Sequence, residues 1–145
     1  MVRVDVDGVT CNYKSQGIWK FGSLVFSSEF CSGNIGSVTQ LGESTFELST
    51  VPDCAGTPQE VSYRTWFYFS VSGIKKDQIL SLCITNLNPQ AKLFNQGLRP
   101  VWRKGSQGRW ERLTQEVSYS TGEGRIFQIR FKFRFGEGAG AAGTA

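Results

Sequence analysis

The 145-residue sequence contains no histidine, which limits the chemistry that its side chains could perform. This excludes serine–histidine and cysteine–histidine hydrolysis, zinc sites with histidine ligands, and histidine acid–base catalysis. Carboxylates would have to supply acid–base chemistry, as they do in glycosidases. Glu43 and Glu47 lie four residues apart, but on or near a predicted strand this spacing builds no helical carboxylate face. We therefore expect no catalysis from this chain alone.

Cysteines are the other reactive side chains, and they lie at positions 11, 31, 54 and 83. None forms the C-x-x-C pair typical of zinc sites, so we expect neither a metal nor another cofactor in this chain. An even number of cysteines is compatible with two disulfides in a secreted protein. Charged residues interrupt any apolar signal core near the N-terminus, however. We therefore expect a cytoplasmic location, with reduced and buried thiols.

Charge is distributed unevenly along the chain, which has a net charge of +4. Residues 1–61 hold 3 basic and 7 acidic side chains, whereas residues 62–145 hold 13 basic and 5 acidic ones. The second half could attract an acidic partner, such as nucleic acid, an anionic membrane surface or an acidic protein segment. Ordinary solvent-facing residues are the alternative explanation. Apolar runs are only a few residues long, so we expect no membrane-spanning helix and no membrane partner.

Aromatic and basic residues alternate in two short segments, residues 102–104 and 109–112. Grooves that bind single-stranded nucleic acid use this mixture, but no motif of a nucleic-acid-binding module accompanies it, so we do not expect nucleic acid as a partner. The tryptophans could instead form a platform for sugars. The alternative is that Trp66 lies in the core and that Trp19, Trp102 and Trp110 pack at the bases of loops.

Alternation of apolar and polar residues predicts β-strands along most of the chain. The clearest run is residues 125–135, which alternate over eleven positions. One face carries Phe127, Ile129, Phe131, Phe133 and Phe135, and the other carries Gln128, Arg130, Lys132 and Arg134. This pattern has a period of two and no helical alternative. Further strands are predicted at residues 23–30, 44–50, 64–71 and 78–85.

Segments rich in glycine, proline and asparagine separate these runs and predict turns. The fold class is therefore all-β, with a single antiparallel β-sandwich of about eight or nine strands over residues 1–135. The strand at 64–71 is apolar on both faces and should be central, residues 1–20 form an edge strand or are loose, and the best candidate helix, around 75–78, is short. Residues 136–145 form a Gly/Ala-rich tail that we expect to be flexible.

The segment 84–100 leaves a strand and turns through several asparagines, whose side chains are expected to cap turns by bonding nearby backbone. Together with two earlier segments it resembles the amino-terminal domain of cytosolic carboxypeptidases, zinc peptidases that remove glutamates from tubulin and other proteins. The similar segments follow the family's order over residues 23–135. They contain Phe30, Ser32, Gly33 and Asn34; Trp66, Phe67, Tyr68 and Phe69; and Asn86, Asn88, Lys92, Gly97 and Pro100.

The resemblance implies a β-sandwich that packs beside a catalytic carboxypeptidase domain. In the family the zinc ligands and the catalytic glutamate belong to that later domain, and none can be mapped onto this chain. The implied function is a non-catalytic accessory domain, whose partners are the peptidase domain and glutamylated tubulin tails. Whether the chain is a truncated product or an isolated domain stays open. The alternative is a freestanding module that binds acidic polymers or carbohydrate.

Two segments are predicted to contact these partners. Residues 86–100 form a conformationally demanding loop, the kind of segment that contacts a neighbouring domain. Arg130, Lys132 and Arg134, named here the ladder, occupy alternate positions of one predicted strand, about 6.6 Å apart. Such a row could attract glutamate-rich tails, and salt would weaken the attraction. A solvated face, or a face covered by the absent domain, is the alternative.

Overall fold

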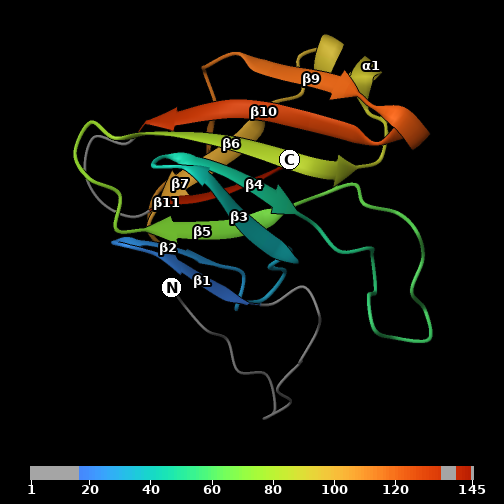
Figure 1. The fold of residues 1–145 in the computed structure, drawn as a ribbon, viewed down its shortest axis with the longest axis horizontal. Coiled ribbons are helices and arrows are strands. Elements are labelled where there is room, and N and C mark those ends of the chain that lie inside the picture. The colour runs from blue at the N-terminus through green and yellow to red at the C-terminus, as the bar shows by residue number, and fades with distance from the viewer. Residues whose placement is uncertain (1–16, 135–139, 145) are drawn as a thin grey trace.

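Two stacked β-sheets form the molecule (Figure 1), which we describe from a computed structural model covering residues 17–134 and 140–144. Sheet A has the strand order β1 (Ile18–Phe21), β2 (Leu24–Ser27), β5 (Tyr68–Ser72), β11 (Gly140–Thr144), β7 (Pro100–Lys104) and β8 (Glu111–Arg112). Sheet B has the order β3 (Ser37–Gly42), β4 (Thr45–Ser49), β6 (Ile79–Leu87), β10 (Phe127–Arg134) and β9 (Val117–Thr121). The helical elements are α1 (Ala91–Asn95) and a 3₁₀ turn, η1 (Glu123–Arg125). Within these residues no helix has the length and apolarity to cross a membrane.

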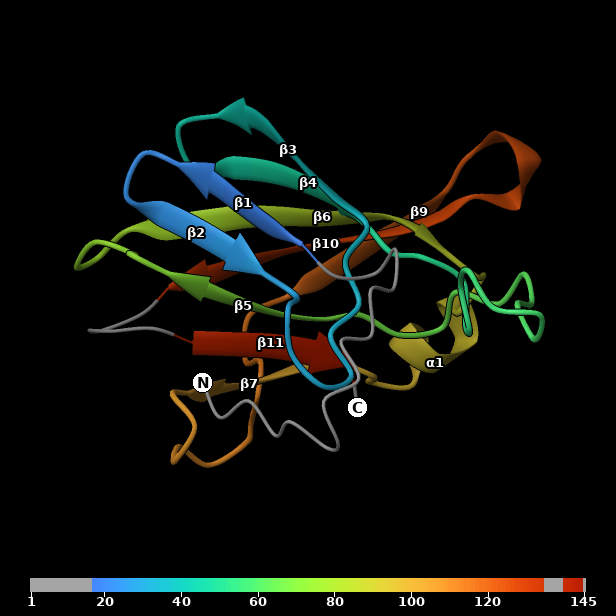
Figure 2. The same cartoon turned by 90° about the horizontal axis from the view of Figure 1, so that it is seen from below.

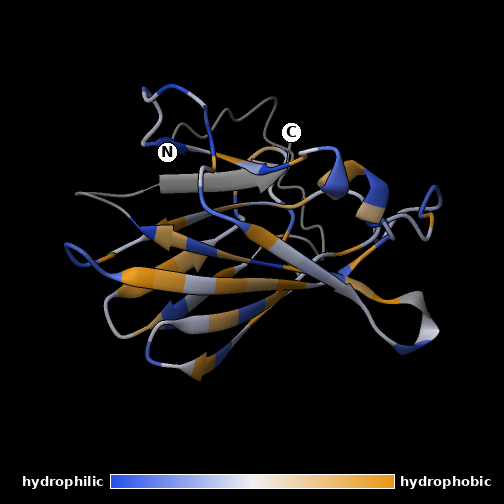
Figure 3. Cartoon of the chain, turned by 90° about the horizontal axis from the view of Figure 1, so that it is seen from above, coloured by the Kyte–Doolittle hydropathy of each residue, from blue (hydrophilic) through white to orange (hydrophobic). Residues whose placement is uncertain are grey.

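Aromatic side chains from both sheets fill the space between the layers. Phe26 of β2 meets Phe46 of β4 with ring centroids 4.8 Å apart, and Trp102 of β7 meets Phe133 of β10 at 5.2 Å. Every second residue of β10, from Phe127 to Phe133, is buried, whereas the ladder side chains are exposed. The predicted two-faced pattern of this strand is therefore confirmed. Figure 3 shows that hydrophobic residues are concentrated on the strands, and that hydrophilic residues predominate in the loops at their ends.

One strand pair departs from the predicted antiparallel arrangement. β4 and β6 run parallel, with Glu47 opposite Cys83, while every other strand pair of the described residues is antiparallel. After β4 the chain crosses to sheet A, forms β5 and returns to sheet B as β6. A parallel pair requires such a long crossover, and residues 50–67 supply most of its length.

The predicted flexible tail is wrong for residues 140–144. They form β11, which pairs with β5 on one side and β7 on the other, in the middle of sheet A. Backbone groups alone make a ladder, so a strand does not require the apolar side chains from which strands are predicted. The remaining tail residues, 135–139 and 145, lie outside the described residues, as do residues 1–16.

Three smaller expectations also need correction. The described residues contain eleven strands rather than eight or nine, partly because β8 and β11 lack a hydrophobic pattern. Residues 75–78 form a turn, in which Gln78 N donates to Lys75 O at 3.1 Å, and the α-helix lies at residues 91–95. β5 is central but begins at Tyr68, because the preceding residues from Arg64 bond to other loops. The predicted edge strand at the N-terminal side is present as β1.

Candidate functional site

Residues 50–67 form a long loop at one end of the sandwich, beside α1 and the connection from β9 to β10 (Figure 2). We call this end the braced end, because asparagine side chains hold the loop to both sheets. Within the loop, Asp53 N donates to Tyr63 O at 2.9 Å, and Val61 N donates to Asp53 O at 3.2 Å. Trp66 Nε1 donates to Asp53 Oδ1 at 3.1 Å. The loop is thus a folded segment with its own hydrogen bonds.

Asn34 holds both ends of the loop together. Its Nδ2 donates to Val51 O at 3.3 Å and to Trp66 O at 3.2 Å, and its Oδ1 accepts from Val51 N at 3.0 Å. The backbone of Asn34 also pairs with Tyr68 of β5. The side chain is 2% exposed, so each bond replaces one that water would otherwise make. Asn34 therefore fixes where the chain leaves sheet B and where it enters sheet A.

Asn86 and Asn88 brace the loop from the end of β6. Asn86 accepts from Thr50 N at 2.8 Å and donates to Thr50 O at 2.8 Å, so it pairs with Thr50 as a backbone strand would. Asn88 N donates to Arg64 O at 2.8 Å, and Asn88 Oδ1 accepts from Arg64 N. These asparagines were expected to cap nearby turns. That expectation is wrong, since they bond backbone groups 36 and 24 positions away.

A tight turn at residues 30–34 presents Asn34 to the loop. Phe30 N donates to Ser28 O and Gly33 N donates to Phe30 O, both at 2.9 Å. A Cβ atom at Gly33 would lie 2.0 Å from Ser28 O, so only glycine fits there. Ser32 adopts a left-handed conformation with φ of 67°. The family-like segment of Phe30, Ser32, Gly33 and Asn34 therefore forms a tight turn that ends in a bracing side chain.

α1 and its exit complete the braced end. Gly97 follows the helix with φ of +95°, a left-handed conformation that glycine tolerates, and Leu98 N donates to Leu93 O at 2.9 Å. Pro100 is buried and begins β7, while Lys92 is exposed. Sequence reasoning placed these residues in one loop, and the structure adds that this loop bonds the long loop through Gln90, whose Nε2 donates to Thr65 O at 3.2 Å.

The aromatic motif from Trp66 to Phe69 divides between the core and the outer surface. Phe67 and Phe69 are fully buried, whereas Trp66 and Tyr68 are half-buried. The interpretation of Trp66 as a core residue is therefore wrong, and its indole bonds the long loop instead. Trp102 and Trp19 pack against the core, and Trp110 is 47% exposed.

Large apolar side chains are exposed at the braced end. Val61 and Tyr63 of the long loop are 44% and 60% exposed, Leu93 of α1 is 49% exposed, and Ile126 after η1 is 52% exposed. The three segments that carry them lie at the same end of the sandwich (Figure 2). β11 also ends there, since Thr144 pairs with Pro100. Several large apolar side chains exposed at one end of a domain are typical of a protein contact.

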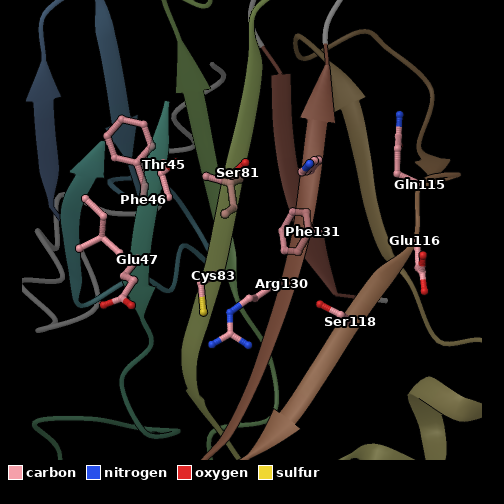
Figure 4. A pocket seen from close by; sticks show the side chains of 13 residues that line it. Thr45, Phe46, Glu47, Ser81, Cys83, Gln115, Glu116, Ser118, Arg130 and Phe131 are labelled. Carbon is pink, nitrogen blue, oxygen red and sulfur yellow. The ribbon is translucent and has the colours of Figure 1, made fainter. Parts of the chain in front are cut away.

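The ladder lies on the outer face of sheet B, along an open hollow of about 550 Å³ that Arg130 and Lys132 line (Figure 4). Glu47 and Glu116 line the same hollow. Arg134 forms an ion pair with Asp77, with 2.8 Å between Nη2 and Oδ1. The three cations therefore have three carboxylates on or beside their face, which reduces its attraction for an acidic ligand.

Cys83 lies between Glu47 and Arg130 in the row of side chains across β4, β6 and β10 (Figure 4). Its burial raises the pKa of the thiol; the Arg130 guanidinium opposes this rise and the Glu47 carboxylate adds to it. Cys31 and Cys54 are exposed and free, so the expectation of buried thiols is confirmed for Cys83 and wrong for these two. Cys11 lies outside the described residues. In residues 17–134 and 140–144, no three cysteine or carboxylate side chains group closely enough to hold a metal ion.

Comparisons with known proteins give a consistent result. Residues 26–138 match the family model of the cytosolic carboxypeptidase N-terminal domain. The chain is 36% identical over 145 aligned positions to cytosolic carboxypeptidase-like protein 5 of Rattus norvegicus, covering 83% of this chain and 17% of the rat protein. It is 32% identical over 100 positions to human cytosolic carboxypeptidase 6, covering 69% of this chain and 19% of that protein. The chain thus spans less than a fifth of these relatives.

A solved structure shares the fold. It is a metallo-carboxypeptidase from Pseudomonas aeruginosa in complex with (2-guanidinoethylmercapto)succinic acid, with a TM-score of 0.58 and 19% sequence identity. The alignment covers 81% of this chain and 28% of that protein. In the two relatives and in the solved structure, the matched region is a minor part of a longer polypeptide.

Proposed function

This chain belongs to the family of cytosolic carboxypeptidase N-terminal domains, and from that premise we propose that it is a non-catalytic accessory domain that docks onto a peptidase domain through the braced end. The observation that carries the proposal is the exposure of four apolar side chains at this end, Val61, Tyr63, Leu93 and Ile126. The first two lie on the long loop, which the motif asparagines hold in place. Ordering a loop before binding lowers the entropic cost of association. We propose the cytosol as its location, in line with the relatives' names.

Zinc, on this proposal, is held by the peptidase domain. The residues of this chain do not fit a zinc site with histidine ligands, because the sequence contains no histidine. The described cysteines and carboxylates are also too dispersed to form one, with Cys31 and Cys54 in surface loops and Cys83 on β6. The contribution of this chain to peptidase chemistry is therefore positional.

A chimera tests the docking surface. This chain would replace the matching region of rat cytosolic carboxypeptidase-like protein 5, and zinc content, solubility and peptidase activity would be measured. We expect Tyr63→Asp/Leu93→Asp to reduce activity or soluble yield by about tenfold, because buried apolar anchors dominate interface energies. The matched control is Leu41→Asp/Ile79→Asp, which changes equally exposed apolar residues at the opposite end of the sandwich. Equal losses for the two variants, or no loss for either, would contradict the proposal.

We further propose that the domain helps to engage the glutamate-rich tails that such a peptidase shortens, those of tubulin included. The basic second half of the chain supports this, with 13 basic and 5 acidic side chains. Titration of this chain with a tubulin-tail peptide is the test, at about 0.01 M and about 0.15 M salt, where the Debye length is about 30 Å and about 8 Å. We expect binding that weakens as salt rises. Absence of binding at the lower salt would contradict tail engagement, but it would not bear on docking to the peptidase domain.

A further inference from the structure

We propose that the β7–β8 hairpin, residues 99–112, is the surface on which this domain binds an acidic peptide segment, in place of the ladder. The inference rests on the tail engagement proposed above and assigns it to a site. Below, these residues are called the basic hairpin. They lie at the edge of sheet A, where β8 is the last strand.

Charge separates the two surfaces. The basic hairpin carries five cations, Arg99, Arg103, Lys104, Arg109 and Arg112, and a single carboxylate, Glu111. In the part of the chain that the structure describes, none of these five forms an ion pair, since the one pair found there joins Arg134 to Asp77. The ladder cations, in contrast, share their face with as many carboxylates. Of these two described surfaces, the basic hairpin therefore carries the larger excess of positive charge.

Two of the five cations position the hairpin. Arg99 Nη1 donates to Phe94 O at 3.2 Å and to Leu98 O at 2.8 Å, and Arg112 Nη2 donates to Gly97 O. These carbonyls lie at the C-terminal end of α1, where cations are favoured. The base of the hairpin is thereby fixed to the braced end, and its tip points away from that end. Arg103, Lys104 and Arg109 are left to meet a ligand.

The three remaining cations lie toward the tip of the hairpin, and one of them, Arg103, is held in place by neighbouring groups. The Arg103 guanidinium lies over the Trp110 ring, 4.8 Å from its centroid, and donates to Ser106 O at 3.3 Å. Lys104 and Arg109 flank the tip of the hairpin, and both are exposed. The tip is tightly closed, because a Cβ atom at Gly108 would lie 2.2 Å from Lys104 O. The Arg103 guanidinium is therefore positioned before an acidic segment binds, and less side-chain entropy would be lost at that residue.

Aromatic geometry favours a peptide over single-stranded nucleic acid. Nucleic-acid grooves stack successive bases on free aromatic faces. Trp110 is the exposed ring of this surface, but Arg103 covers one face and Tyr68 contacts it at 5.8 Å. Tyr68 in turn packs edge-on against Phe30 at 4.7 Å. The rings therefore position a guanidinium, which pairs bidentately with a carboxylate, and leave no row of stacking faces.

A charge-matched pair of variants tests the assignment in the full chain. The probe is a fluorescein-labelled peptide of alternating glutamate and glycine, followed by fluorescence anisotropy at about 0.01 M salt. We expect Lys104→Gln/Arg109→Gln to raise Kd by about fivefold to thirtyfold, since each exposed ion pair contributes up to about 1 kcal/mol. The control, Arg130→Gln/Lys132→Gln, removes the same charge from the ladder and is expected to change Kd by less than about twofold. Arg109→Lys in place of Arg109→Gln is expected to restore most of the affinity.

Each other outcome is informative. If the ladder variant weakens peptide binding as much as the hairpin variant or more, the assignment to the hairpin is wrong, but tail engagement still stands. If the wild-type chain does not bind the peptide, both the assignment and tail engagement are wrong. A thymidine oligonucleotide of equal charge that binds more tightly than the peptide also overturns the inference. Far-ultraviolet circular dichroism and urea unfolding verify that the variants fold, and the changed side chains are exposed ones at the hairpin tip.

Discussion

Asn34, Asn86 and Asn88 bond backbone groups that lie between 17 and 36 positions away in the sequence. Each amide offers both a donor and an acceptor, so one side chain can replace a missing strand neighbour. The sequence identified these residues as members of a motif, but not their partners. A hydrogen bond between a side chain and distant backbone leaves no periodic pattern, because the partner residue can be of any type.

Asn86→Asp is the sharpest test of the bracing. Aspartate can still accept from Thr50 N, but it cannot donate to Thr50 O, which loses its partner in a partly buried site. We expect a loss of about 2 kcal/mol in the free energy of unfolding, measured by urea denaturation. Gln40→Glu, the same amide-to-acid change on the exposed edge strand β3, should leave stability nearly unchanged. An equal effect of both changes would mean that charge, rather than bracing, is responsible.

Two glycines distinguish the energetic cost of a steric clash from the cost of a left-handed backbone conformation. Gly33→Ala places a Cβ atom 2.0 Å from Ser28 O, a carbonyl that is fixed because it accepts from Phe30 N. We expect this change to cost about 3 kcal/mol or more. Gly22 has φ of +61° in open space, so Gly22→Ala should cost about 1–2 kcal/mol through conformation alone. Thermal unfolding of both variants measures the difference, and similar midpoints would show that the turn at 30–34 relaxes easily.

Cysteine reactivity follows burial. Cys31 and Cys54 are exposed, while burial raises the pKa of the Cys83 thiol above its ordinary value. We expect iodoacetamide to modify Cys83 at least about tenfold more slowly than Cys31 and Cys54 at neutral pH, as mapped by mass spectrometry. Because the folded-state pKa exceeds the unfolded one, the contribution of Cys83 to stability is full below the unfolded value and is lost as pH rises through the folded one. Modification of Cys83 as rapid as that of Cys31 would contradict its placement.

At the scale of elements, prediction succeeded where strands bury one face. The alternation in β10 and the apolar runs of β2, β4 and β6 lie where they were predicted. β11 was missed because glycine and alanine carry too little side chain to alternate in hydropathy. The parallel pairing of β4 and β6 was missed as well, because it depends on the crossover path rather than on either strand. Hydrophobic patterning therefore misses strands without bulky side chains and pairings that depend on the connection between strands.

Removal of β11 tests its central position. A chain ending at residue 135 leaves β5 and β7 without a shared neighbour, and strand pairings over nine register positions are lost. We expect the stability to fall by about 3 kcal/mol or more, since each lost ladder hydrogen bond contributes about 1 kcal/mol. Circular dichroism during thermal unfolding measures this loss. Ala142→Pro, which removes one backbone donor, should also lower the midpoint of thermal unfolding. Unchanged midpoints for both variants would show that residues 140–144 form a flexible tail, as the sequence predicted.

At the scale of the whole molecule, the base of the basic hairpin adjoins the braced end, whereas its tip lies at the other end of β7 (Figure 2). Arg99 and Arg112 bond the carbonyls that follow α1, so the apolar surface and the cationic surface share one support. A peptidase domain seated on the braced end would contact the base of the hairpin, and an acidic segment would extend along β7 from there to reach the cations at the tip. The sequence predicted the family and the sandwich, but the meeting of these surfaces depends on contacts between residues far apart in the chain.

Hydrogen–deuterium exchange tests the central claim most directly, comparing this chain alone with the same residues in the rat chimera. We predict that backbone amides in residues 53–63, 91–98 and 122–126 become protected in the chimera, because the docked peptidase domain excludes water from the braced end. Amides of β3 at the far edge of sheet B should exchange at the same rate in both. Protection confined to β3 or to the outer face of sheet B, with the braced end unchanged, would contradict the account.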